Sequence, residues 1–580
     1  MLSIRNIIRL TPLAIILSTL YISMLPVEQS WSDGEMALTY IVPTAILLSM
    51  FINVTSKTFC KTGLIDILLI AWYLLIVVSA YIQNIFPVAT IVLKSTLLLA
   101  LFYAVRFSFE IQSYNRDYIA IFIILVCLIE ALLGIYQTIT SCSRNNNYHI
   151  TGTFLNPGPL GTLLSCGLIL LFALMNKYRK VIQRNKSHYI SNISLVLAGS
   201  IIATALLVTQ SRSAILAFTI CLLYMYRLRI RKHLWTICIG GVVFLFVLYL
   251  LKHRSADSRL IIWWVSLNNI TNHPLIGSGI GSFLNQYANG MAEISSNMKD
   301  GQFNNTDIIH YAFNYFLYIW VEQGVIGVFL FLSIIAVTFF NIRKNNSIIK
   351  WTLPILLITS LFSYTFELLP FQLITVIVCA SLFSTKHICS KTHKTVIFAL
   401  LIFFFILSIL SIPYIKQRVT ANIQYAQIAG IHTKEYIQDY YRLFPYMQEN
   451  PKFLFDFAKT LANSKRYNDS NAILQKGQLI SADPMFFVIQ GNNYTEMGEF
   501  TLAEKYYKRG FAVMPNRIYP LYKLMLLYEL KGQHSKSIKI AKRITSFPIK
   551  KFSTATKSMK NDAMRIINSD KIRASPPTKQ

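Results

Sequence analysis

Long apolar stretches, most of them about 17 to 25 residues, recur along the first 413 residues of the chain. A helix of about 20 such residues crosses the ~30 Å hydrocarbon core of a bilayer, and a soluble enzyme has no place for many of them. The chain is 54% hydrophobic, 13% aromatic and only 14% charged, which also excludes a disordered protein. The sequence therefore predicts an all-α, polytopic membrane protein.

We predict about 12 to 13 transmembrane helices from these stretches. Their boundaries are residues 10–25, 36–52, 64–82, 86–105, 118–139, 157–175, 190–208, 213–226, 234–251, 313–340, 351–364, 370–383 and 396–413. Three of these stretches, 213–226, 351–364 and 370–383, are shorter than a full span. A long loop, about 252–312, separates the ninth stretch from the tenth.

The distribution of Lys and Arg between alternate loops predicts the orientation. With the N-terminus in the cytoplasm, about 21 basic residues lie in inner loops and about 6 in outer loops of the membrane part. An odd number of spans then places the region after Pro413 outside. A bacterial inner membrane with a periplasmic C-terminal region fits this pattern best.

The C-terminal region has a repeat of about 33 residues, marked by Pro451, Pro484, Pro515 and Pro548. Each unit has a turn near its middle, at residues 465–467, 498–500 and 532–534. This period resembles that of tetratricopeptide repeats, which are helix pairs stacked into a solenoid. We predict a membrane domain over 1–413, a connecting segment over 414–449 and a repeat domain over 450–580. A protein partner or simple packing on the membrane domain would both suit the repeats.

About half of the net charge of +30 lies after Pro413, and most of the rest follows the positive-inside pattern. Neither share indicates a nucleic-acid partner. No spacing of His, Cys or acidic residues suggests a metal, so we expect no metal site and no cofactor. Lys94 and Glu130 lie within predicted spans, and we expect them to pair with each other.

A few arginines are predicted on the outer face of the membrane domain. Arg212 lies in a short turn between two spans, and Arg254 and Arg259 open the long loop. Arginine binds phosphate oxygens through a planar fork of donors. These residues therefore predict a site for a lipid-linked phosphate or diphosphate, with snorkelling at the headgroups as the alternative for each.

Six short motifs, in this order, carry a family resemblance. They are GTFLNP at 152–157, SRSA at 211–214, RLIIW at 259–263, HPLIGSGIGSF at 273–283, AFNYFL at 312–317 and EQGVIG at 322–327. Together with the number of spans, they resemble the O-antigen ligase and polymerase superfamily, which includes bacterial O-linked oligosaccharyltransferases.

The resemblance implies transfer of a glycan from an undecaprenyl-diphosphate carrier to an acceptor hydroxyl at the periplasmic face. Arg212 and Arg259, with Arg254 nearby, would bind the diphosphate and stabilise the leaving group. The resemblance also implies a histidine immediately before Asn314, but Phe313 stands there. His310 lies one helical turn earlier, on the same face if the helix extends back, and is the candidate to act on the acceptor hydroxyl.

Three functions are left open. The first is the glycan transferase, whose acceptor is lipid A-core, another glycan or a protein. The second is a transporter or flippase for the same lipid-linked glycan, which would need charged residues lining several spans. The third is a non-catalytic membrane scaffold that acts through its repeats.

Overall fold

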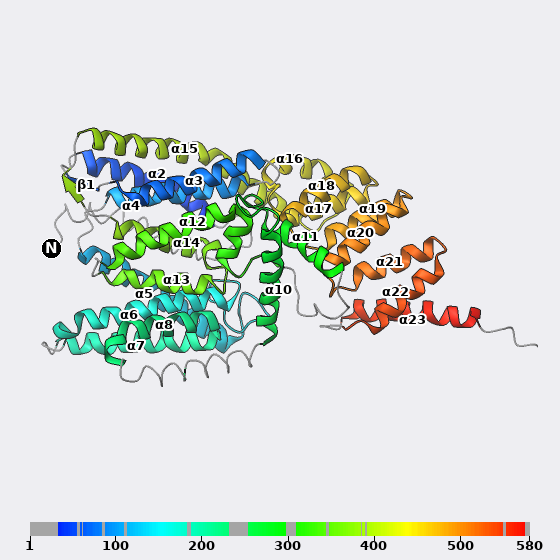
Figure 1. Ribbon diagram of the computed structural model, residues 1–580, viewed down its shortest axis with the longest axis horizontal. Helices are drawn as coiled ribbons and strands as arrows, with labels where there is room; N and C mark the ends of the chain where they lie inside the picture. The colour runs from blue at the N-terminus through cyan, green and yellow to red at the C-terminus, as the bar shows by residue number, and fades with distance from the viewer. Residues whose placement is uncertain are drawn as a thin grey trace, which may run out of the picture.

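A computed structural model describes most of the chain. The described residues are 33–54, 58–60, 62–83, 88–108, 113–182, 187–230, 240, 253–296, 309–343, 347–383, 386–388, 391–548 and 553–574. They form a helical bundle followed by an array of shorter helices (Figure 1).

Most bundle helices run side by side along one direction (Figure 1). They are α2 (Asp33–Val54), α3 (Leu64–Gln83), α4 (Ala89–Ser108), α5 (Ser113–Thr140), α6 (Pro157–Ile182), α7 (Ser187–Thr209), α8 (Arg212–Ile230), α12 (Tyr315–Arg343), α13 (Thr352–Ser360), α14 (Leu369–Leu382) and α15 (Lys391–Ile428). The short strands β1 (Thr58–Cys60) and β2 (Lys386–Ile388) pair antiparallel. Helix α10 (His253–Ile270) crosses the end of the bundle that faces the array, here called the array-facing end (Figure 1).

Six described helices are long and apolar enough to cross a membrane: α3, α4, α5, α6, α12 and α15. Shorter apolar segments lie in α2, α7, α13 and α14, and the predicted span 213–226 falls on α8. The predicted spans 10–25 and 234–251 lie outside the described residues, apart from residue 240. The apolar helices support a multi-pass membrane protein.

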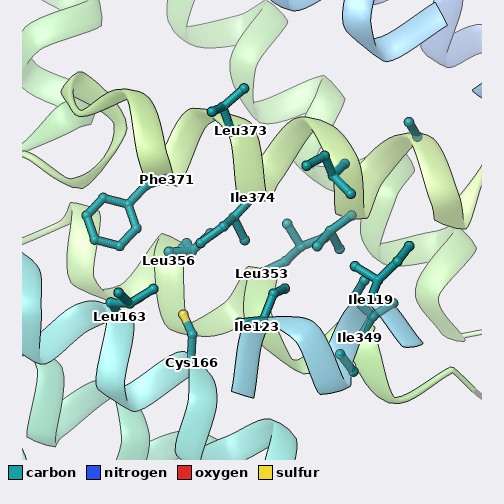
Figure 2. Close-up of a cluster of buried hydrophobic side chains, with 14 of the residues drawn as sticks. Ile119, Ile123, Leu163, Cys166, Ile349, Leu353, Leu356, Phe371, Leu373 and Ile374 are labelled. Atoms are coloured by element: carbon teal, nitrogen blue, oxygen red, sulfur yellow. The ribbon is translucent and has the colours of Figure 1, made fainter. Parts of the chain in front are cut away.

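Helices α13 and α14 form a short hairpin inside the bundle. Side chains of α5 and α6, such as Ile123 and Leu163, point toward Leu353, Leu356 and Ile374 of this hairpin (Figure 2). Helix α14 has 14 residues, about 21 Å, which is less than the ~30 Å of hydrocarbon. The turn that joins the two helices is recessed, and its residues 363–366 are buried.

Helices of the array follow one another in pairs. They are α16 (Ile437–Met447), α17 (Pro451–Asn463), α18 (Tyr467–Ile480), α19 (Met485–Glu496), α20 (Phe500–Val513), α21 (Tyr519–Leu530), α22 (His534–Ser546) and α23 (Thr554–Ala574). The turns within three pairs have a residue with positive φ: Lys465 (61°), Gly498 (79°) and Gly532 (66°). These turns lie where the repeat predicts them, although the assignment to tetratricopeptide repeats stays a prediction.

Two connections hold the array against the bundle. Helix α15 runs for 38 residues from the bundle into the first array helices (Figure 1). Helix α11 (Phe283–Ser296), which follows α10, packs against α18 and α20. A single apolar cluster joins α10 and α11 to Phe487 and Val513 of the array. The segment 252–312 is therefore helical over much of its described length, rather than an open loop.

Candidate functional site

Arg259 is held at the array-facing end of the bundle by contacts on two sides. Its Nη1 donates a 2.7 Å hydrogen bond to the Phe362 carbonyl oxygen, in the turn between α13 and α14. Its guanidinium lies 5.1 Å from the ring centroid of Phe313. Burial, followed by the nearby charge of Arg212, lowers the pKa of the Arg259 guanidinium to about 10. The side chain is thus oriented, partly desolvated and close to a second cation.

Arg212 is the first residue of α8, directly after a tight turn. Gln210 has a φ of 50°, and the Ser211 N–H donates to Thr209 Oγ1 at 3.2 Å. A Cβ at Gly161 of α6 would lie 2.6 Å from Ser211 Cβ, so this glycine lets the turn pack closely on α6. Arg212 therefore lies on a different helix from Arg259, near enough for the two charges to interact.

The other two predicted site residues have different surroundings. Arg254 lies on α10, but its side chain is outside the described residues. His310 is exposed, and its ring contacts only the neighbouring Tyr311 ring, 6.4 Å away between centroids, among the described ring pairs. The structure does not bring His310 into contact with either arginine.

The expectation that His310 shares a helical face with Asn314 is wrong. Helix α12 begins at Tyr315, and Asn314 Oδ1 accepts hydrogen bonds from Phe316 N (3.0 Å) and Leu317 N (3.2 Å) as its N-cap. Phe313 has a φ of 53°, so the chain turns away before the helix and cannot extend it back.

Two glycine motifs that are distant in the sequence meet at a kink in α12. Gly324 has φ 65° and ψ −166°, which interrupts the helix and frees backbone groups on either side. The N–H groups of Ser278 and Gly279 donate to the Val321 and Glu322 carbonyl oxygens at 2.8 and 2.9 Å. In return, the N–H of Val325 donates to the Pro274 carbonyl oxygen at 2.9 Å.

These backbone hydrogen bonds between residues 274–279 and 321–325, here called the glycine clamp, require a glycine in each of the two segments. A Cβ at Gly277 would lie 2.4 Å from the Glu322 carbonyl carbon, and one at Gly324 would lie 2.3 Å from the Leu275 oxygen. Glu322 Oε1 also accepts from the Phe283 N–H at 3.2 Å, which satisfies an N-terminal donor of α11. The glycine-rich segment is therefore structural: it fixes α10 and α11 against α12.

A cavity of about 430 Å³ lies inside the bundle, among α3, α4, α12, α13 and α14. Most of its wall is apolar, from Ile65 and Leu69 of α3 to Leu353 and Leu357 of α13. Its polar groups come from three parts of the bundle and include Lys94, Tyr311, Tyr315, Glu322, Glu367 and Gln372.

The cavity adjoins the arginine site. The Tyr311 ring, which lines the cavity, stacks on the Tyr364 ring at 4.0 Å and 6°. Tyr364 in turn lies within electrostatic reach of Arg259. One recessed turn therefore supplies the carbonyl that holds Arg259, the stacked Tyr364 and the cavity residue Glu367.

Lys94 and Glu130 do not pair as expected. Glu130 accepts hydrogen bonds from the Thr153 N–H (3.0 Å) and the Thr153 hydroxyl (2.8 Å). Lys94 instead lies within electrostatic reach of Glu367. Glu367 is not among the residues predicted from the sequence. Its position, as an acidic residue between two short apolar stretches, is a signal that could have indicated it.

The middle of the chain matches a known protein family. Residues 193–332 match the family model described as O-Antigen ligase. This match supports the O-antigen ligase superfamily. The matched region includes α8, α10, α11 and the kink of α12, and thus both arginines and the glycine clamp. A search of curated proteins found no match.

The match has consequences at the level of the family. O-antigen ligase and polymerase activities are associated with this family, which supports a glycosyltransferase-like membrane enzyme. Glu367, Gln372 and Lys94 all lie outside the matched residues. No group of three or more His, Cys, Asp or Glu residues suited to a metal occurs in the described part of the chain.

Proposed function

We propose that this protein transfers a glycan from an undecaprenyl-diphosphate carrier to an acceptor hydroxyl, and that Arg212 and Arg259 bind the diphosphate. The observation that carries the proposal is the approach of these two guanidinium groups from separate helices at one end of an apolar bundle. Two cations held close together repel each other, and a diphosphate between them would relieve that repulsion. The family match of this region supports the same reaction class.

In the proposed reaction, the bond between the anomeric carbon and the diphosphate oxygen breaks, and a bond from that carbon to the acceptor oxygen forms. The arginines stabilise the negative charge that develops on the departing diphosphate. His310 takes the proton of the acceptor hydroxyl. The acceptor is lipid A-core, another glycan or a protein.

We further propose that the array-facing end lies on the periplasmic side of a bacterial inner membrane, with the N-terminus in the cytoplasm. The carrier then reaches the arginines from the outer leaflet. The helical array, as a tetratricopeptide-like repeat domain, would receive a polypeptide acceptor or an assembly partner.

The test is an in vitro transfer assay with an undecaprenyl-diphosphate-linked glycan and the purified full chain. We expect Arg212→Ala and Arg259→Ala each to reduce transfer by about 10²-fold or more, because each removes a charged donor from the leaving group. Arg466→Ala is the matched control, since Arg466 is exposed on the array and pairs only with nearby Asp469 and Tyr441 among the described residues. Wild-type transfer by both site variants would refute the diphosphate site.

A second candidate, a transporter for the same lipid-linked glycan, is favoured by one observation. The cavity brings Lys94, Glu322 and Glu367 together from three elements of the bundle, as expected for a polar path through a membrane protein. Reconstitution in liposomes with a fluorescent lipid-linked glycan tests it. Movement between leaflets without transfer would favour the transporter, and transfer without movement the enzyme.

A further inference from the structure

The cavity beside the arginine site contains a carboxylate that needs hydrogen-bond donors. Oε1 of the Glu367 carboxylate is fully buried and accepts no hydrogen bond among the described residues. Gln372 uses its Nε2 to donate to the Phe366 carbonyl oxygen at 2.7 Å, which leaves its Oε1 without a partner. Buried acceptors without partners are costly, so a ligand that brings donors would be stabilised here.

The charges of the cavity argue against a phosphate as its occupant. Two carboxyl groups, Glu322 and Glu367, face a single ammonium, that of Lys94. A doubly charged anion would meet two acidic groups and the oxygen of Gln372, all of which are acceptors. The arginines outside the cavity suit phosphate far better.

The remaining wall suits a sugar. Aromatic rings of Trp72, Tyr311 and Tyr315 line the cavity beside the unpartnered acceptors. Small-molecule sites commonly combine such apolar faces with a few well-placed polar groups, and hydroxyl groups can donate to Glu367 and Gln372 while a ring face packs on the aromatics.

The cavity lies next to the site proposed for the diphosphate of the donor. Tyr311 lines the cavity and stacks on Tyr364, which lies within electrostatic reach of Arg259. A sugar attached directly to a diphosphate on the arginines would lie next to this wall. We propose that the cavity is a carbohydrate subsite, in which Glu367 and Gln372 accept hydrogen bonds from hydroxyl groups of the donor sugar adjacent to the diphosphate.

This inference rests on the proposed function, so the experiment separates the two. Binding to the detergent-solubilised full chain is measured by native mass spectrometry with two probes: undecaprenyl diphosphate, and the same carrier linked to one N-acetylglucosamine. The variants are Glu367→Gln and Gln372→Leu. Glu130→Gln is the matched control, because this buried carboxyl is bonded to Thr153 and does not line the cavity.

We expect wild-type protein to bind the sugar-linked carrier more tightly than the bare one. Each cavity variant should weaken binding of the sugar-linked carrier about tenfold, and that of the bare carrier by less than about twofold. The Glu130→Gln control should change neither affinity. Arg259→Ala should weaken the binding of both carriers, and this result reports on the diphosphate site alone.

Several outcomes would overturn the subsite. If the cavity variants weakened the binding of both carriers equally, the cavity would hold the lipid or the diphosphate. Unchanged binding of both would mean that it holds only water, and the diphosphate site would still stand if Arg259→Ala lost binding. Failure of both carriers to bind the wild type would refute the proposed function and the subsite together.

Discussion

The residue directly before the N-cap of α12 differs from the one that the family resemblance implies. Phe313 stands where the family resemblance implies histidine, and its ring lies beneath the Arg259 guanidinium. Asn314 keeps a role that needs no histidine, because its side chain caps α12. An aromatic ring stabilises and orients a guanidinium, so Phe313 would support the proposed diphosphate site rather than act on the acceptor.

His310 is the remaining candidate for the proton of the acceptor hydroxyl. Its side chain is exposed and lies beside Tyr311, a residue that lines the cavity. We expect His310→Ala to lower kcat for transfer by about 10²-fold with little change in the donor KM, as for loss of a general base. His432→Ala, a histidine change between α15 and α16, is the control. Wild-type kcat in His310→Ala would remove the histidine from the mechanism and leave the arginine site untouched.

At the scale of elements, the shape of the site depends on two interrupted structures. The kink of α12 at Gly324 exposes backbone groups that hold the glycine-rich segment, and this segment positions α10 with Arg259. The short α13–α14 hairpin recesses a turn into the bundle, where it meets Arg259 and the cavity. A straight α12 or a full-length hairpin would remove these contacts.

Gly324→Ala should therefore damage both stability and activity. The new Cβ would lie 2.3 Å from the Leu275 oxygen, at a φ that disfavours any side chain, so we expect a loss of about 1–3 kcal/mol or more. Gly199→Ala is the control, because a Cβ there would make an ordinary 3.5 Å contact with Leu171 in a regular helix. The thermal unfolding midpoint in detergent and the transfer rate are the measurements. Equal midpoints for the two variants would show that the clamp is not needed.

The molecule as a whole depends on contacts that tie the array to the bundle. Arg418 of α15 forms a buried ion pair with Glu449 at 2.9 Å, just before α17. The Glu449 carboxylate also accepts from the Thr90 N–H at 3.0 Å and from the Thr90 hydroxyl, at the start of α4. Lys94 lies one turn further along α4 and lines the cavity. The first helices of the array are therefore bonded to a helix that forms part of the cavity wall.

Arg418→Ala tests this connection. Removing one partner leaves a largely buried carboxylate without its cation, and we expect a loss of about 3–5 kcal/mol. Arg442→Ala should cost about 1 kcal/mol or less, because its pair with Asp439 is exposed. The measurements are the free energy of unfolding of each variant in detergent and the rate at which a protease cleaves the chain between the bundle and the array. A similar small effect for both would mean that the array is held by other contacts.

Length and apolar composition were enough to predict the helical bundle, because a segment that crosses hydrocarbon must be both long and apolar. The 33-residue period likewise placed the turns at 465, 498 and 532, where a positive φ marks each unit. Residue type alone singled out Arg212 and Arg259, since few other cations lie in the predicted outer loops. These features are local, and local physics determines them.

The tertiary structure decided what depends on distant contacts. The hydrogen bonds of Ser278 with Val321 and of Arg259 with Phe362 join segments that no periodicity relates. The electrostatic interaction of Lys94 with Glu367 also joins such segments. The same applies to Glu130, whose partner is Thr153 rather than Lys94. A buried polar group takes the partner that packing brings near it, and packing is a property of the whole fold.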